Sequence, residues 1–200
     1  MFYWFLFLVD NNPELIRRTI KESFDALGGN SPIKLWQLHS PNSKYRLESV
    51  LGPVKEAVSL GLIQYVGVSN FNVNQIVQAI KVLPIVSVQN EHNLWNREPE
   101  RNGVLSYCEK NNLIFLPWSP VGGGSRYKKL LQFKSLNDLA ARKSCSVYSL
   151  MLAWLMHKSP CVVPIPGASK ITSIEGSAIS IDIKLTKEDM QFIDDFSETL

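Results

Sequence analysis

The alternation of strand-like and helix-like segments constrains this chain more than any other feature of its sequence. From Pro13 onward, short runs rich in Val, Ile and Leu are separated by helical patterns of ten or more residues. Strands joined by helices of that length form βαβ crossovers and a parallel sheet. The runs are apolar on both faces, as expected where helices cover both sides of a sheet. The predicted strands are 33–38, 64–68, 84–88, 113–117 and 161–165.

The helical segments carry recognisable start and stop signals. The first begins at Pro13, a residue favoured at the start of a helix, and Gly28 and Gly29 follow its end. Gly61 ends the second in the same way. A long loop is predicted around the three consecutive glycines 122–124. The predicted helices are 13–27, 46–60, 73–82, 98–110, 135–157, 172–180 and 187–196.

The polar residues that follow the strands distinguish between two α/β folds, a doubly wound open sheet and a (β/α)8 barrel. A doubly wound dinucleotide domain would show a GxGxxG motif after its first strand, and the glycines 122–124 come too late for that spacing. In a barrel, functional side chains gather at the carboxyl ends of the strands. Such residues follow each strand here, and the barrel is therefore favoured: Gln37, His39, Ser69, Asn70, Gln89, Asn90, Trp118, Ser119, Gly167, Ser169 and Lys170.

Composition excludes several classes of protein. The chain has 21 Lys and Arg against 18 Asp and Glu, a balance too even and too dispersed for a nucleic-acid binder. No apolar run approaches the ~20 residues of a membrane-spanning helix. Three widely spaced cysteines indicate free, buried thiols in a reducing, cytoplasmic compartment rather than disulfides or a metal site. Residues 1–12 form an apolar N-terminal segment without a basic region or cleavage site, so a strand is favoured over a signal peptide.

Five segments together resemble the aldo-keto reductase family, in the family's order and at similar spacing. They are KLWQLHSP (34–41), GLIQYVGVSNF (61–71), VSVQNEHNLWNR (86–97), LPWSPVGGG (116–124) and VVPIPGAS (162–169). The resemblance covers the chain from about Pro13 to its end, which makes 13–200 the expected domain. It implies a (β/α)8 barrel that reduces a small aldehyde or ketone with NADPH.

The resemblance also implies roles for individual residues. His39 corresponds to the active-site histidine that orients and polarises the substrate carbonyl. Ser69, Asn70 and Gln89 correspond to residues that bind the nicotinamide carboxamide, and Trp118 to the aromatic ring on which the nicotinamide stacks. Without the family context, these residues would be read as strand-end caps and core. The phosphate-binding positions are Ser119, Pro120, Val121 and Gly123 for the pyrophosphate, and Gly167, Ser169 and Lys170 for the adenosine 2′-phosphate.

The sequence departs from the family in two places. Gly176 and Ser177 replace the acidic residue and asparagine expected at the adenine, and Ser173 replaces an arginine, so the preference for NADPH over NADH stays open. The catalytic Asp, Tyr and Lys of the family lie in a part not found here, so we expect an incomplete barrel lacking about its first two βα units. Impaired catalysis is then expected. Unpaired barrel edges could accept a partner subunit.

Two alternatives follow from the residues. A non-catalytic NADP-binding or regulatory module built from the same barrel would keep the cofactor residues without the chemistry. A metal-dependent barrel hydrolase would need several ligands at the strand ends, and only His39 qualifies, so no metal is expected. His92 and His157 lack a comparable motif context and are predicted to be surface residues of a helix or loop.

Overall fold

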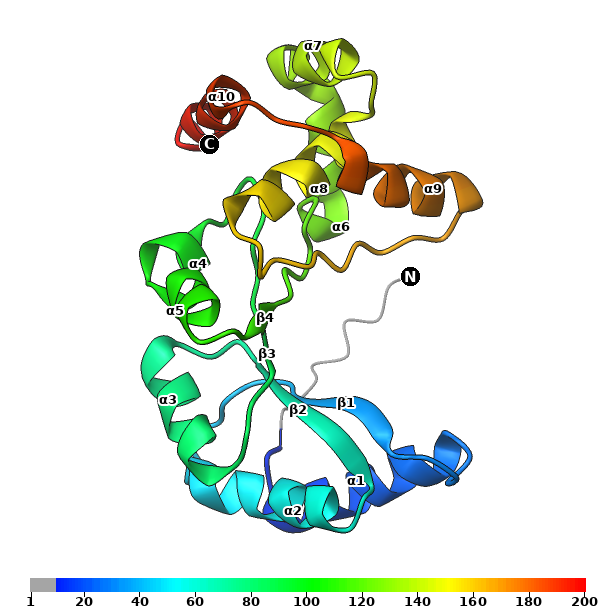
Figure 1. Ribbon diagram of the computed structural model, residues 1–200, viewed down its shortest axis with the longest axis vertical. Coiled ribbons are helices and arrows are strands. Elements are labelled where there is room, and N and C mark those ends of the chain that lie inside the picture. Colours follow the sequence, from blue (N-terminus) through cyan, green and yellow to red (C-terminus); the bar gives the residue numbers. More distant parts are fainter. Residues whose placement is uncertain (1–9) are drawn as a thin grey trace. The chain divides into compact units, whose positions relative to one another are not determined.

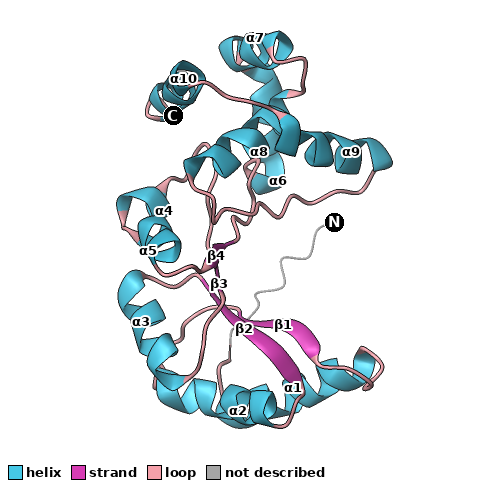
Figure 2. Ribbon diagram, viewed as in Figure 1, coloured by secondary structure: helices cyan, strands magenta, loops and turns pink. Residues whose placement is uncertain are grey.

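The protein is described by a computed structural model that covers residues 10–200, apart from the side chain of Ser125. The chain divides into two compact units, Met1–Val88 and Gln89–Leu200. Figures 1 and 2 show the elements of both units. The predicted N-terminal strand falls within residues 1–9, outside the described part of the chain.

The first unit consists of successive βα pairs. Its strands lie in the order β1-β2-β3, and β1 pairs in parallel with β2 with Leu38 opposite Val68. The backbone N–H of Val86 donates to the carbonyl of Val66 (2.9 Å), which places the start of β3 beside β2. The elements are α1 (Pro13–Ala26), β1 (Ile33–Leu38), α2 (Leu47–Ser59), β2 (Ile63–Ser69), α3 (Val73–Val82) and β3 (Ser87–Gln89), which straddles the division.

The helices of the first unit follow from local signals in the sequence. Asn12 caps α1 by accepting the N–H of Glu14, and Asn72 forms a capping box with Gln75 at the start of α3. The core lies where α1 and α2 pack together and where α2 covers β2, with Ile20, Val54 and Val66 nearly inaccessible to solvent. The bounds predicted for β1 and α3 are confirmed residue for residue.

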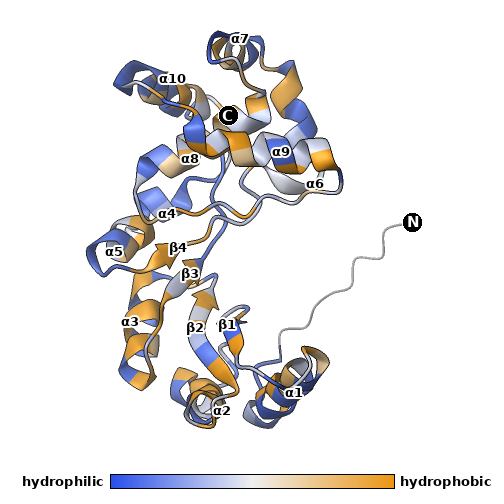
Figure 3. Ribbon diagram, turned by 45° about the vertical axis from the view of Figure 1, so that its right-hand side comes forward, coloured by the Kyte–Doolittle hydropathy of each residue, from blue (hydrophilic) through white to orange (hydrophobic). Residues whose placement is uncertain are grey.

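The second unit is mostly helical and is built around α8 (Val147–Lys158). This helix is apolar on all sides, and eight of its twelve residues are buried, which is the pattern of a helix surrounded by others. Figure 3 shows β4 as hydrophobic along its length. The remaining elements are α4 (Glu98–Arg101), α5 (Val104–Lys110), β4 (Ile114–Phe115), α6 (Gly123–Lys129), η1 (Leu130–Gln132), α7 (Lys134–Arg142), α9 (Ile171–Ile179), η2 (Ser180–Asp182) and α10 (Lys187–Ser197).

Several predicted elements of the second unit are wrong in extent. The helix expected over 98–110 is broken at Gly103 (φ +83°), and the one expected over 135–157 is broken at Ser144 (φ +54°). The strand expected over 113–117 contains only two paired residues. The strand expected over 161–165 is reduced to a single parallel bridge between Phe115 and Val162. Prolines supply part of the reason, because Pro164 and Pro166 have no N–H to donate to a sheet ladder.

Candidate functional site

A cavity of about 710 Å³ in the second unit lies between the loop that follows β4 and the beginning of α9. Seven of the predicted cofactor-binding residues line it, although they come from two segments more than forty residues apart. They are Ser119, Pro120, Val121, Gly123, Gly167, Ser169 and Lys170. The predicted phosphate-binding segments are thus adjacent in space.

The cavity wall combines apolar side chains, among them Val121, Leu152 and Ile165, with hydroxyl groups, and it contains no carboxylate among the described lining residues. Serine and threonine hydroxyls surround it, Lys170 supplies a cation, and the N-terminus of α9 adds the partial positive charge of a helix dipole. Burial raises the pKa of the Tyr148 phenol, with a smaller contribution from Tyr127, so Tyr148 stays neutral near pH 7. Such a surface fits an anion, and a phosphate group in particular.

The loop at one side of the cavity has an unusual backbone. Ser119 adopts a left-handed conformation (φ +49°), and its carbonyl accepts the N–H of Gly122 at 2.8 Å to close a tight turn. Gly123 is also left-handed, and a Cβ there would lie only 3.0 Å from the Cβ of Ser119. The predicted long loop ends here, because α6 begins at Gly123 with a kink at Gly124.

Serine side chains link α8 to α9 on the opposite wall. The hydroxyl of Ser149 donates to the carbonyl of Gly176 (2.8 Å) and also contacts the hydroxyl of Ser146 (2.7 Å). The positions at which the sequence departs from the family, Ser173, Gly176 and Ser177, all line the cavity. Their small side chains therefore affect the same space as the predicted phosphate-binding residues.

In the first unit, three predicted site residues meet at the carboxyl ends of two adjacent strands, β1 and β2. The side-chain amide of Asn70 donates to the carbonyl of His39 (3.0 Å) and to the hydroxyl of Ser69 (3.2 Å). Asn70 is left-handed (φ +61°), a conformation that asparagine tolerates better than most residues. The His39 side chain is exposed and Ser69 is buried. His39, Ser69 and Asn70 thus form one polar cluster at this edge of the sheet.

Gln89 and Trp118 belong to the second unit, and both are half-buried. Trp118 forms a parallel bridge with Glu91, and its N–H donates to the carbonyl of Asn90 (3.1 Å). The convergence of these two residues with His39 and Asn70 on one nicotinamide stays a prediction.

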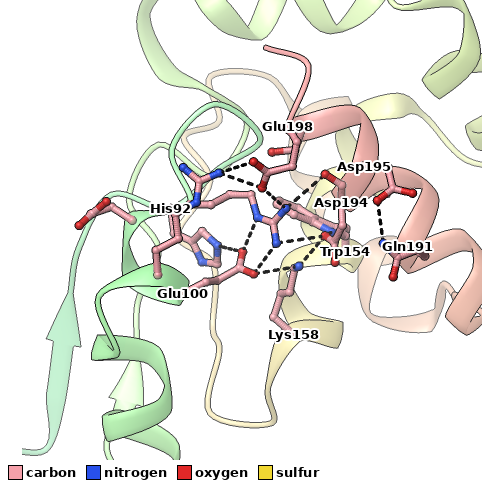
Figure 4. A network of polar contacts seen from close by, with 12 residues as sticks. His92, Glu100, Trp154, Lys158, Gln191, Asp194, Asp195 and Glu198 are labelled. Carbon is pink, nitrogen blue, oxygen red and sulfur yellow. Dashed lines mark hydrogen bonds and ion pairs between the residues drawn. The ribbon is translucent and has the colours of Figure 1, made fainter.

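A network of charged residues connects the segment after β3 with α8 and α10 (Figure 4). His92 donates from Nε2 to Oε1 of Glu100 (2.8 Å), and Arg97 and Lys158 contact the same carboxylate at 2.7 and 3.0 Å. Lys158 also reaches Asp194 on α10 at 2.5 Å. Burial alone would raise the pKa of Glu100, but hydrogen bonds from His92 and Arg97 and the charge of Lys158 hold it well below its usual range.

The sequence prediction for His92 is wrong. A surface position in a loop or helix was expected, whereas the ring has no accessible surface and lies between Phe115 and Trp154, with centroids 5.9 Å from each. His157, for which the same expectation was made, is exposed. No sequence pattern indicates the pairing of His92 with Glu100, because it depends on how the chain packs.

The sequence reasoning also missed the asparagine-rich turn that follows β3. Asn93 is fully buried, and its amide donates to the carbonyl of Ser119 at 3.1 Å, while Trp95 lies against Gly122. The segment was recognised only as part of a motif, although a run of three asparagines within seven residues is a strong turn signal.

Residues 10–200 contain neither a candidate metal cluster nor a candidate membrane span. No group of three or more His, Cys, Asp or Glu side chains is arranged to hold a metal ion there. In the same range, no helix combines the length and apolar character needed to cross a membrane.

The parallel βα units, and a cavity beyond the strand ends, define an α/β protein of the kind that binds ligands at that edge. Comparison with known families is more specific, because the aldo/keto reductase family matches residues 8–198. The chain belongs to this family.

Individual relatives agree with this assignment. An uncharacterized oxidoreductase of Schizosaccharomyces pombe is 34% identical over 176 residues, which are 88% of this chain and 56% of that protein. The NADP(+) aldo-keto reductase yakc of the same yeast is 27% identical, over 89% of this chain and 61% of yakc. The chain therefore spans less than two thirds of the length of either relative.

Solved structures show the same fold. The chain superposes on the thermostable aldo-keto reductase Tm1743, solved with the inhibitor epalrestat, with a TM-score of 0.78 and 32% identity. The match covers 89% of this chain and 64% of that structure. The predicted fold class is thereby confirmed as the α/β barrel of the aldo-keto reductases, of which this chain spans a part.

Proposed function

We propose that this chain carries the NADP(H)-binding portion of an aldo-keto reductase, and that the whole protein reduces a small aldehyde or ketone to an alcohol. The observation that carries the proposal is the cavity formed by the Ser119–Gly124 loop and the start of α9. Serine and threonine hydroxyls, glycines and one lysine line it together with apolar side chains, and carboxylates are absent from its described lining. This donor set suits the phosphates of a dinucleotide.

Different residues would bind different parts of the cofactor. Lys170 and Ser169 would bind the adenosine 2′-phosphate, while Ser119 and Gly123 would bind the pyrophosphate. Trp118 would stack on the nicotinamide, and Ser69, Asn70 and Gln89 would hold its carboxamide and so choose the ring face. Bound NADPH supplies a hydride to the carbonyl carbon, and a proton to the oxygen completes the alcohol and leaves NADP(+).

His39 would act on the substrate rather than on the cofactor. Asn70 donates to the backbone carbonyl of His39, whose side chain is exposed, and an exposed imidazole can donate a hydrogen bond to a substrate carbonyl oxygen, which orients the carbonyl and favours hydride arrival. The catalytic Asp, Tyr and Lys expected of the family are not among the residues identified here. A module that binds NADP(H) without turnover is the alternative that the same cavity supports.

Calorimetric titration of NADPH into the purified chain tests the proposal, with Lys170→Gln and Lys129→Gln compared. Lys170 lines the cavity and Lys129 does not, so only Lys170→Gln should weaken binding, by about fivefold for one exposed charge pair. Equal effects of both variants would contradict the proposed site. Carbonyl-dependent oxidation of NADPH by the whole protein then separates the reductase from the non-catalytic module, because only the reductase consumes the cofactor.

Two further proposals concern the setting of the protein. Cys108, Cys145 and Cys161 are all free thiols, which supports a reducing compartment such as the cytoplasm, and cell fractionation would test this. A partner subunit on a barrel edge remains a separate prediction, for which sedimentation velocity would show a species heavier than the monomer.

A further inference from the structure

The loop that borders the cavity is attached to the asparagine-rich turn following β3, residues 90–96. The attachment begins in the backbone, where the N–H of Trp118 donates to the carbonyl of Asn90 and Trp118 bridges Glu91 in parallel. The two segments thus run together past the ends of their strands. The conformation of the loop from Ser119 onward therefore depends on its hydrogen bonds and contacts with this turn.

Asn93 makes the decisive contact between the two segments. Its side-chain NH2 donates to the carbonyl of Ser119 and to Oε1 of Glu91, both at 3.1 Å. Its side-chain oxygen accepts the N–H groups of Trp95 and Asn96, both at 3.0 Å. A primary amide offers two donors and two acceptor sites, so all of the hydrogen-bonding capacity of Asn93 is used. The residue is completely buried, which makes each of these bonds costly to lose.

The Ser119 carbonyl held in this way belongs to a backbone that L-residues rarely adopt. Ser119 has a φ of +49°, and the same carbonyl also accepts the N–H of Gly122. A left-handed serine persists only where its surroundings impose the conformation. The bond from Asn93 is such a constraint, since it fixes the direction of the carbonyl and therefore of the turn that follows.

Trp95 constrains the next part of the loop by contact. A Cβ placed on Gly122 (φ +97°) would lie 2.9 Å from Cε3 of the indole, so glycine is required there for the backbone to rest on the ring. The indole in turn packs against Phe133, with ring centroids 6.2 Å apart. The turn thus contacts the loop in two ways, through the hydrogen bond from Asn93 and through the Trp95 ring that packs against Gly122.

We propose that Asn93 and Trp95 are positioning residues that hold Ser119–Gly124 in the shape needed to bind a pyrophosphate. Neither residue lines the cavity, so both act through the loop. The inference rests on the proposed function, because it assumes that the loop contacts the phosphates of NADP(H). It predicts that affinity for the pyrophosphate depends on the turn, whereas affinity for the 2′-phosphate end at Lys170 does not.

The test compares two nucleotides on two matched variants. Asn93→Ala removes the anchor, and Asn111→Ala removes an exposed asparagine that also donates to a backbone carbonyl, that of Tyr107. NADPH contains the pyrophosphate, and adenosine 2′-monophosphate lacks it. We expect Asn93→Ala to raise the Kd for NADPH about tenfold and to leave the Kd for adenosine 2′-monophosphate within about twofold, with Asn111→Ala changing neither.

If Asn93 only supports general stability, Asn93→Ala should weaken the binding of both nucleotides together. That result, or unchanged binding of NADPH, would overturn the inference. If Asn93→Ala does not fold, Trp95→Phe is the second variant. It keeps an aromatic ring near Phe133 but removes the part of the indole that contacts Gly122. Trp95→Phe should raise the Kd for NADPH alone by about threefold. Equal weakening of both nucleotides, or unchanged NADPH binding, would count against the inference. Failure of the wild-type chain to bind either nucleotide would instead refute the proposed function, which keeps the two failures distinguishable.

Discussion

Replacing Glu100 with glutamine should destabilise the second unit strongly, because Glu100 is the common acceptor of its buried charge network. The carboxylate receives hydrogen bonds from His92, twice from Arg97 and from Lys158, at 2.7–3.0 Å. Lys158 is 8% exposed and Arg97 13% exposed, so neither cation can regain full hydration. Removing one partner of a buried pair typically costs about 3–5 kcal/mol.

The expected loss lies at the lower end of that range. Lys158 keeps its contact with Asp194, and Arg97 keeps the carbonyl of Asp194 and the carboxylate of Glu198, so both cations retain partial compensation. We therefore expect Glu100→Gln to lower the free energy of unfolding by about 3 kcal/mol. In a chain of this size that corresponds to a fall in Tm of about 6–12 °C.

Thermal and urea denaturation, followed by circular dichroism, would measure the change. Asp138→Asn is the control, since it breaks an exposed i,i+4 pair with Lys134 and should cost less than about 0.5 kcal/mol. A loss of less than about 1 kcal/mol in Glu100→Gln, or equal losses in the two variants, would refute the view that this network is buried and coupled.

Three other predictions follow from single features of the structure. The pKa of Glu100 is lowered in the folded state, so its contribution to stability is complete above its ordinary pKa of 4.5 and should fall as the pH drops below that value. Glu100→Gln should therefore make the free energy of unfolding less dependent on pH below 4.5, as measured by urea denaturation at several pH values. Burial raises the pKa of the Cys108 thiol to about 12, with Cys161 adding to the shift, so iodoacetamide should leave Cys108 unmodified until urea unfolds the chain, and early labelling seen by peptide mass spectrometry would contradict this. Gly122→Ala should weaken NADPH binding at least tenfold, because a Cβ would meet the ring of Trp95, and unchanged affinity in a calorimetric titration would count against the loop geometry.

The sequence predicted the first unit better than the second, and the reason lies in local signals. The strand Ile33–Leu38 and the helix Val73–Val82 have clear apolar patterns and flanking caps, and their bounds came out as predicted. In the second unit, breaks at Gly103 and Ser144 were hidden inside continuous helical patterns. Both breaks adopt left-handed backbone, which a pattern of apolar residues does not reveal.

For the candidate site, motifs in the sequence indicated which segments to compare in space, whereas contacts that depend on folding were not predicted. The two segments that their motifs predict to bind phosphates line one cavity in the structure. The buried positions of His92 and Asn93 were not recognised, since their partners Glu100 and Ser119 are identified only by the packed structure. A polar side chain in a loop motif is expected at the surface unless its partners are known.

Tryptophan fluorescence during an NADPH titration tests the central claim, that this chain holds a nicotinamide dinucleotide against Trp118. NADPH should quench the emission of the wild-type chain in a saturable manner, and Trp118→Phe should lose most of that quenching. Saturable quenching that persists undiminished in Trp118→Phe would place the cofactor elsewhere, and the absence of any saturable change in the wild-type chain would contradict the account.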